Sequence, residues 1–357
     1  MKILITGGAG FIGSHLVDRL LAQGHEVCVI DNYATARRDN LGPHNQLRVV
    51  EGTIAEHSLV DRVFDEFRPD QVVHAAASYK DPDNWQEDSL TNVVGTANVV
   101  QAAKRCNVKK LMYFQTALCY GLKPLEQPIT LTHPIRSEGS SYAISKTAGE
   151  QYVMLSGLNW LSFRLANAYG PRNLSGPLPT FYHRLTSNKP CFVMDTRRDF
   201  VFIDDLVQVV LMAIEGKGQS GTYHISSGSD YSIKDLFNAT VQALGIRLDR
   251  EVEVRPRNPD DAFTILLDPS KTLDDFVGWK VRTPLEKGVA SALDYYKRFG
   301  ITQTFTHLKA LDEKTAVDPG FPYTMLSQQF VKDFAFGRGN APLVDNHRLR
   351  RIGRSWS

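Results

Sequence analysis

The order of apolar and polar segments predicts strands that alternate with helices along the first half of the chain. Apolar runs of strand length are expected to form strands at residues 2–6, 25–30, 47–51, 71–75, 110–115 and 161–165. Apolar residues at helical spacing predict helices at residues 14–23, 59–67 and 89–106, and another that begins near residue 142. This alternation is typical of an α/β fold with a doubly wound parallel sheet.

A glycine-rich segment joins the first predicted strand to the first predicted helix. Gly7, Gly10 and Gly13 lie in this turn, and Asp31 follows the second strand. Glycines allow backbone N–H groups and the helix N-terminus to approach a pyrophosphate, as in the Rossmann fold. A carboxylate at Asp31 can accept hydrogen bonds from an adenosine ribose and would repel a 2′-phosphate. The pattern predicts that NAD binds in preference to NADP, although Arg37 and Arg38 could favour NADP.

Other residues of the predicted lobe are expected to lie along the cofactor. Small side chains after the fourth strand would let the chain pass close beneath it, although close packing explains them equally well. The further predicted cofactor contacts are Phe11, Ile12, Asn32, Thr53, Ile54, Ala75, Ala76 and Ala77.

Tyr142 and Lys146 are predicted to supply acid–base chemistry. Four residues apart on a helix, they lie on one face, about one turn from each other. A free tyrosine has a pKa near 10. An ammonium neighbour, together with the positive nicotinamide ring of NAD, favours the phenolate and lowers that pKa. Thr116, at the carboxyl end of the fifth strand, could then hydrogen-bond the substrate hydroxyl that loses its proton.

The composition indicates a soluble enzyme. The chain has 357 residues, enough for two lobes, and a net charge of +2 with acids and bases interspersed, so neither nucleic acid nor a membrane is an expected partner. Four scattered cysteines lack metal-ligand spacing, which favours a reduced cytoplasmic setting and predicts no metal site.

Over about residues 1–300 the chain resembles the extended short-chain dehydrogenase/reductases, specifically the nucleotide-sugar epimerase branch typified by UDP-galactose 4-epimerase. The motifs that carry the resemblance are the glycine turn with Asp31, Thr116-Ala117-Leu118-Cys119-Tyr120-Gly121, Tyr142-Ala143-Ile144-Ser145-Lys146, and Arg164 to Arg172.

The resemblance implies roles for further residues. Asn92 matches an asparagine that supports the active-site helices beside the cofactor, and Thr116 matches a residue that positions the sugar hydroxyl. Asn167 and Arg198 match residues that contact the nucleotide diphosphate. In the second half of the chain, Asp261 stands at the family spacing, whereas an insertion leaves open whether Arg255 or Arg257 contacts the diphosphate.

The sequence also departs from the family pattern. Thr53 stands where an aspartate usually bonds the adenine amino group, so that hydrogen bond should be weaker or absent. Phe202 stands where the family has histidine. The loop at residues 78–85 is unusually charged and aromatic. Lys80 in that loop either recognises a substrate substituent such as a carboxylate or belongs to an ordinary polar surface loop.

Three regions are expected: an NAD-binding domain at residues 1–170, a nucleotide-sugar-binding lobe at residues 171–300 interleaved with it, and a C-terminal extension at residues 301–357. The extension contains many aromatic residues and a predicted helix at residues 325–336. We expect it to pack on the body or on a partner subunit.

The function implied is NAD-dependent inversion at C4 of a nucleotide-linked hexose or uronic acid through a 4-keto intermediate, and the expected nucleotide is UDP. Relatives that eliminate water or decarboxylate carry acidic residues after the threonine, whereas this chain has Ala117-Leu118-Cys119. An oxidoreductase, decarboxylase or dehydratase and a catalytically silent NAD-binding protein remain alternatives. The resemblance also implies a homodimer formed through the helices at residues 89–106 and 142–155.

Overall fold

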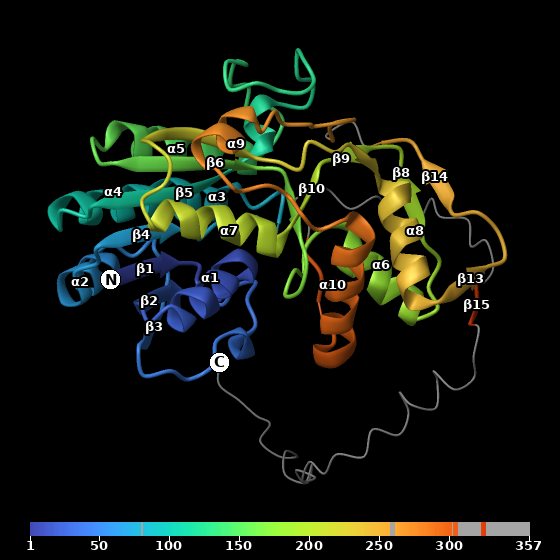
Figure 1. The fold of residues 1–357 in the computed structure, drawn as a ribbon, viewed down its shortest axis with the longest axis horizontal. Helices are drawn as coiled ribbons and strands as arrows, with labels where there is room; N and C mark the ends of the chain where they lie inside the picture. Colours follow the sequence, from blue (N-terminus) through green and yellow to red (C-terminus); the bar gives the residue numbers. More distant parts are fainter. Residues whose placement is uncertain (80, 258–260, 302, 306–322, 326–357) are drawn as a thin grey trace, which may run out of the picture.

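The computed structural model describes residues 1–79, 81–257, 261–301, 303–305 and 323–325. Its larger lobe is built on a parallel sheet of seven strands, and its smaller lobe carries helices α6, α8 and α10 (Figure 1). The expected helix at residues 325–336 lies outside the described residues except for Met325, which ends a strand.

The seven strands follow the order β11-β6-β5-β4-β1-β2-β3, which confirms the doubly wound parallel sheet. Their bounds are β1 (Lys2–Thr6), β2 (Glu26–Asp31), β3 (Leu47–Glu51), β4 (Gln71–His74), β5 (Lys110–Thr116), β6 (Trp160–Leu165) and β11 (Gly221–Ile225). The first six lie where the apolar runs predict them. The seventh comes from residues after 171, so the two halves of the chain interleave.

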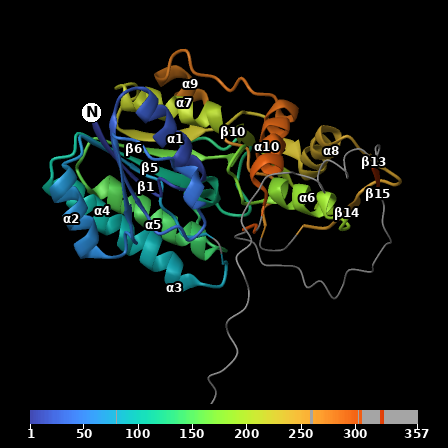
Figure 2. The ribbon, with the colours of Figure 1, turned by 90° about the horizontal axis from the view of Figure 1, so that it is seen from below.

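Helices cover both faces of this sheet, as Figures 1 and 2 show. One face packs against α1 (Phe11–Ala22) and α7 (Ile203–Ile214), and the other against α2 (His57–Phe67), α4 (Thr96–Arg105) and α5 (Ser141–Leu155). Ile3 and Ile5 of β1 lie in the first core and Leu4 in the second. Burial of both faces explains why the central strands are continuous apolar runs.

Short helical segments connect the strands of the larger lobe. They are η1 (Arg38–Asn40), α3 (Trp85–Asp88), η2 (Ser89–Gly95), η3 (Ala117–Tyr120) and α9 (Ser270–Asp275). Among the described residues, none of the helices is long and apolar enough to cross a bilayer.

The smaller lobe consists of three helices and short paired strands. The helices are α6 (Pro177–Thr186), α8 (Ile233–Leu244) and α10 (Leu285–Phe299). The strand pairs are β7 (Asn167–Tyr169) with β10 (Phe200–Phe202), β9 (Arg197–Arg198) with β12 (Tyr231–Ser232), β8 (Phe192–Met194) with β14 (Glu253–Arg255), and β13 (Ile246–Leu248) with β15 (Tyr323–Met325).

His74 ties the sheet to the helical layer at the carboxyl end of β4. Its side chain is fully buried between the hydroxyls of Thr6 and Thr96, at 2.6 and 2.9 Å from its two ring nitrogens. Burial, and then the positive charge of Lys146, lower the pKa of His74 from 6.5 to about 3. The folded protein therefore holds this imidazole neutral at a pH where the unfolded chain is protonated.

This difference predicts acid-sensitive stability. Between pH 6.5 and pH 3 the unfolded chain binds the proton that native His74 excludes, so each unit of falling pH removes roughly 1.4 kcal/mol of unfolding free energy. Urea unfolding at pH 7.5 and pH 5 should show a smaller loss for His74→Gln than for the wild type. Parallel losses would contradict the assignment. Both proteins retain His224, whose pKa burial lowers to about 4, so its contribution cancels in the comparison.

Candidate active site

The glycine turn after β1 is packed too closely for larger residues. Gly7 has φ +68°, and a Cβ there would lie 2.7 Å from the Ala76 backbone. At Gly13 a Cβ would lie 2.2 Å from the Gly7 carbonyl oxygen. Gly10 begins α1, and no side chain caps that helix. An uncapped helix N-terminus beside a tight glycine turn fits the pyrophosphate of a dinucleotide.

Asp31 ends β2 beside this turn. Its carboxylate accepts hydrogen bonds from the backbone N–H groups of Ala9 at 2.9 Å and Tyr33 at 2.8 Å. Burial raises the pKa of Asp31, and these hydrogen bonds oppose that rise. Asp31 thus lies at the end of β2 beside the glycine turn, and its contact with an adenosine ribose stays a prediction.

Arg37 and Arg38, which could have favoured NADP, are paired with other groups of the protein. The Arg37 guanidinium contacts Asp39 at 2.6 Å and donates to the Phe299 carbonyl oxygen at the end of α10. The Arg38 guanidinium contacts Glu51 at 2.6 Å. Both arginines therefore have carboxylate partners within the protein, and the preference for NAD over NADP stays a prediction.

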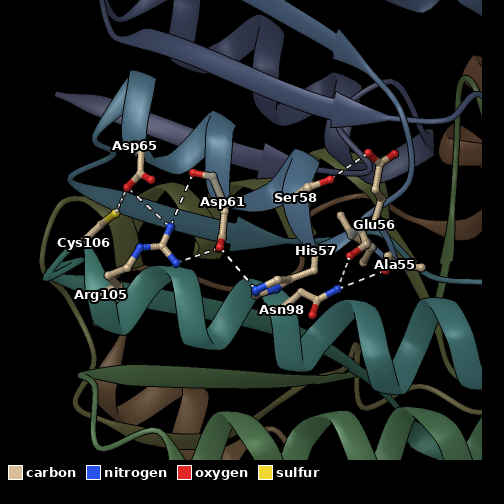
Figure 3. Close-up of polar contacts among 10 residues, drawn as sticks. Ala55, Glu56, His57, Ser58, Asp61, Asp65, Asn98, Arg105 and Cys106 are labelled. Carbon is tan, nitrogen blue, oxygen red and sulfur yellow. Dashed lines mark hydrogen bonds and ion pairs between the residues drawn. The ribbon is translucent and has the colours of Figure 1, made fainter.

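The turn after β3, which carries Thr53 and Ile54, is fixed from α4. The Asn98 amide donates to the carbonyl oxygens of Ile54 at 2.9 Å and Ala55 at 3.2 Å (Figure 3). Further along the two helices, Arg105 of α4 contacts Asp61 and Asp65 of α2, which Figure 3 also shows. The turn expected beside the adenine is therefore held by two hydrogen bonds from the Asn98 amide. Surface ion pairs join α2 to α4 further along the two helices.

The remaining predicted cofactor contacts lie on α1 or directly after β2 and β4. Phe11 and Ile12 form the first turn of α1, and Ala75 to Ala77 follow β4, where the Ala75 N–H donates to the Thr6 carbonyl oxygen at 3.0 Å. Asn32 is exposed, and its side chain accepts a hydrogen bond from Ala34 N–H at 3.1 Å.

Asn92 connects the loop after β4 to helix α5. Its amide donates to the Ser145 hydroxyl at 3.0 Å and to the Ser78 carbonyl oxygen at 3.1 Å. The continuous helix predicted at residues 89–106 is wrong in one respect, because residues 89–95 form the π-helix η2. A π-helical turn shifts the helix register, a feature frequent at functional sites, and apolar spacing does not reveal it.

Thr116, Tyr142 and Lys146 come from adjacent elements. Thr116 ends β5, and Tyr142 and Lys146 lie in the first part of α5, which packs against β5. Lys146 is only 2 % exposed, and its Nζ lies 4.0 Å from the centre of the Tyr113 ring. Burial lowers the pKa of Lys146 to about 7, while the carboxylate of Glu150 opposes this effect.

The pKa of Tyr142 lies above its usual value in the protein alone. Burial is the main cause, followed by the nearby Tyr79 and Asp88. The lowered pKa expected beside the Lys146 ammonium is therefore not found, because burial and these neighbours raise it.

A cavity of about 550 Å³ borders Tyr142 and Leu118 and reaches Asp261 of the second half of the chain. Tyr79 lines it, with its ring edge-on to Tyr142 at 6.3 Å between centroids and its hydroxyl accepting from Ser175 at 3.3 Å. The sequence analysis missed Tyr79, although the aromatic character of its loop was the available signal. Lys80 lies outside the described residues.

Asp88 is a second residue that the sequence analysis missed. It lines the same cavity from the end of α3 and is 1 % exposed. Burial raises its pKa, and hydrogen bonds with the hydroxyls of Ser141 and Ser78 oppose that rise. No spacing rule connects a residue of this loop to Tyr142, so only the fold reveals the proximity.

The residues predicted to bind a diphosphate separate into two groups. Arg198 contacts the Asp261 carboxylate at 2.5 Å, and Arg257 donates to the Asp261 carbonyl oxygen at 2.8 Å. Arg255 instead pairs with Glu253 at 2.8 Å and stacks on Phe192. Of the two candidates left open by the sequence, Arg257 is thus the one beside Arg198 and Asp261.

Asn167 is exposed at the start of β7. Its backbone N–H donates to the Asp199 carbonyl oxygen at 2.9 Å.

Residues 3–226 match a family described as the NAD dependent epimerase/dehydratase family. Among solved structures, the chain is similar to the Bordetella bronchiseptica enzyme WbmH in complex with NAD+, with 53% identity, a TM-score of 0.81, and coverage of 84% of this chain and 99% of that one. It is also similar to WbmG of the same organism in complex with NAD and UDP, with 45% identity, a TM-score of 0.80, and coverage of 87% and 99%.

Curated relatives include two kinds of enzyme. A UDP-glucose 4-epimerase of Mycolicibacterium smegmatis is 30% identical, with 83% of this chain and 99% of the relative covered. UDP-glucuronic acid decarboxylase 6 of Arabidopsis thaliana is 32% identical, with 84% and 90% covered.

Removing the charge of Asp31 should change cofactor selection. In Asp31→Asn the side chain keeps its size but loses the charge-assisted bonds to a ribose and the repulsion of a 2′-phosphate, so the affinity ratio of NAD to NADP should fall by about tenfold or more. Titration of cofactor-free protein with each dinucleotide measures this ratio. Asp294→Ser, on the exposed surface of α10, is the control. An unchanged ratio in Asp31→Asn would refute the role.

Proposed function

Because the chain belongs to the NAD dependent epimerase/dehydratase family, we propose that it is an NAD-dependent nucleotide-sugar 4-epimerase. The observation that carries this proposal is that Thr116 ends β5, against which α5 packs with Tyr142 and Lys146, and that Tyr142 borders a cavity reaching Asp261, the ion-pair partner of Arg198. The NAD-dependent relatives and neighbours support the same reaction class.

Each residue of the triad has a defined task in this reaction. The Thr116 hydroxyl hydrogen-bonds the sugar C4 hydroxyl, and Tyr142 removes its proton while C4 is oxidised. Bound NAD supplies reversible two-electron oxidation. Lys146, one helical turn from Tyr142 on α5, would supply positive charge in its protonated form, within a buried environment that strengthens electrostatic interactions. After the 4-keto sugar turns over in the pocket, the hydride taken from C4 would return to its opposite face, which inverts C4, while Tyr142 returns the proton to the C4 oxygen.

Elimination and decarboxylation are less well supported. η3 follows Thr116 directly and carries Ala117, Leu118 and Cys119, none of which is a carboxylic acid. Asp88 does supply a carboxylate in the cavity, from the end of α3, and its Oδ1 has no hydrogen-bond partner among the described residues. The relatives named as decarboxylases keep this chemistry as the second candidate.

The substrate we infer is a UDP-linked hexose or uronic acid. Arg198 bonds the Asp261 carboxylate and Arg257 bonds the Asp261 carbonyl oxygen, and we infer that these two arginines contact the diphosphate. A neighbour bound to UDP supports this nucleotide. The expectation of a cytoplasmic protein, drawn from the scattered cysteines, stays a prediction.

We also propose that the chain forms a homodimer through η2 and α5. Large apolar side chains are exposed on α3, η2 and α5, which pack against one another. They are Trp85, Leu90, Val94, Ile144, Tyr152 and Leu155. Apolar side chains gathered on adjacent helices are typical of a surface that a second copy covers.

The reaction is tested with a panel of UDP- and other nucleotide sugars, followed by proton NMR. We expect one member to reach equilibrium with its C4 epimer, with no net accumulation of NADH. A 4-keto-6-deoxy product or a pentose would overturn the assignment and favour dehydration or decarboxylation.

Removing the Tyr142 hydroxyl should abolish turnover without unfolding the protein. Tyr142→Phe loses the acid–base group and should lower kcat by about 10²- to 10⁴-fold. NAD content and thermal unfolding should match the wild type. Tyr182→Phe in the smaller lobe is the control and should retain activity. If Tyr142→Phe keeps more than about a tenth of wild-type kcat, the role is wrong.

Charges on the exposed apolar patch should dissociate the dimer. Leu90→Glu and Leu155→Glu place carboxylates at the proposed interface, so light scattering after size-exclusion chromatography should give the mass of one chain. Val277→Glu introduces the same charge at an 80% exposed position after α9 and should leave the dimer intact. A monomeric wild type would contradict the proposal.

A further inference from the structure

Gln115 is a buried polar residue in an otherwise apolar strand. It precedes Thr116 at the end of β5 and is 2% exposed. A buried amide costs free energy unless its oxygen and nitrogen both find partners. The partners that Gln115 finds all belong to the active-site region.

The Gln115 side chain joins strand β5 to helix α5. Its Oε1 accepts a hydrogen bond from the Thr116 backbone N–H at 2.8 Å. Its Nε2 donates to the Lys146 carbonyl oxygen at 3.2 Å and to the Glu150 carboxylate at 3.3 Å. One side chain therefore contacts the backbone of two residues of the triad and the helix that carries the third.

Glu150, which accepts a hydrogen bond from Gln115, is itself held by a network of buried side chains. Glu150 is fully buried and forms an ion pair with Arg164 of β6 at 2.9 Å. Arg164 also donates to the Tyr120 hydroxyl at 2.7 Å, and that oxygen lies 2.6 Å from Nε2 of His224 in β11. The network thus connects α5 with β6, η3 and β11.

We propose that Gln115 is a positioning residue, which fixes Thr116 relative to Tyr142 and Lys146 through its bonds to helix α5. The inference rests on the proposed function, because it assigns Gln115 a task in that reaction. A shift of the reacting groups by about 1 Å can lower a rate by about 10²-fold. Gln115 does not contact the substrate in this account, so its loss acts on turnover rather than on binding.

The chain offers a matched control. Gln71 lies at the opposite end of the sheet, at the start of β4, where its buried Nε2 donates to the Ile214 carbonyl oxygen at 3.0 Å. Gln115→Met and Gln71→Met remove the same amide while keeping side-chain length. Only the first change removes bonds to Thr116, Lys146 and Glu150.

Steady-state kinetics should separate positioning from general stability. Gln115→Met should lower kcat by about 10- to 100-fold and change KM for the sugar nucleotide by less than about threefold. Gln71→Met should keep kcat within about twofold of the wild type. In a Thr116→Ala background, Gln115→Met should cause little further loss, because it acts through Thr116. Multiplicative losses, or an unchanged kcat, would overturn the proposal.

Hydrogen exchange provides a readout that needs no turnover. Loss of the Gln115 amide should speed exchange in peptides that contain the Thr116 N–H, whereas Gln71→Met should not. Gln115→Asn, whose shorter amide fails to reach α5, should behave like Gln115→Met and serves if the latter does not fold. If the wild type shows no epimerase activity but the Gln115 variant still shows faster exchange at Thr116, the proposed function is rejected and the placement of Thr116 by Gln115 stands. Unaltered exchange would overturn the placement itself.

Discussion

The active site depends on a lysine side chain that the fold holds out of water. Lys146 lies against the Tyr113 ring, and its pKa falls to about 7 because burial disfavours the charged form. Glu150, one helical turn further along α5, opposes that fall, and Arg164 in turn neutralises Glu150. Removing one member of a buried ion pair leaves an uncompensated charge. Lys146, Glu150 and Arg164 are therefore coupled electrostatically, and the Glu150–Arg164 ion pair holds the helix that carries Tyr142 and Lys146 against β6.

The interleaving of the two lobes brings the substrate residues to this unit. Strand β11 and helix α7 belong to the second half of the chain but complete the sheet of the first. Arg198 and Asp261 are then held close to the cavity that Tyr142 borders. Tyr79, which bonds Ser175 of the second half, forms a direct link between the lobes beside Tyr142. The proposed acid–base residue Tyr142 and the substrate-lobe residue Asp261 thus line the same cavity.

The sequence predicted the sheet and the acid–base residues because each follows a local rule. Continuous apolar runs form buried strands, and a tight turn between a strand and a helix needs glycine. Residues four apart on a helix, such as Tyr142 and Lys146, lie on one face. The sequence could not predict Asp88 beside Tyr142 or the ion pair of Arg198 with Asp261, because these contacts join distant segments. The spacing of apolar residues also could not reveal that residues 89–95 form a π-helix rather than an α-helix. For Gln115 there was a signal, an amide inside a buried strand, whose partners only the fold identifies.

The central claim is that oxidation at C4 and its reversal occur on one substrate within one closed site. A nucleotide sugar carrying deuterium at C4, incubated with the enzyme and unlabelled NAD in ordinary water, tests it directly. The account predicts that the epimer keeps deuterium at C4, because the hydrogen that leaves C4 returns to the same carbon. Mass spectrometry and proton NMR would measure that retention. A C4 epimer that carries solvent hydrogen at C4, or a product that has lost the label without inversion, would contradict the account.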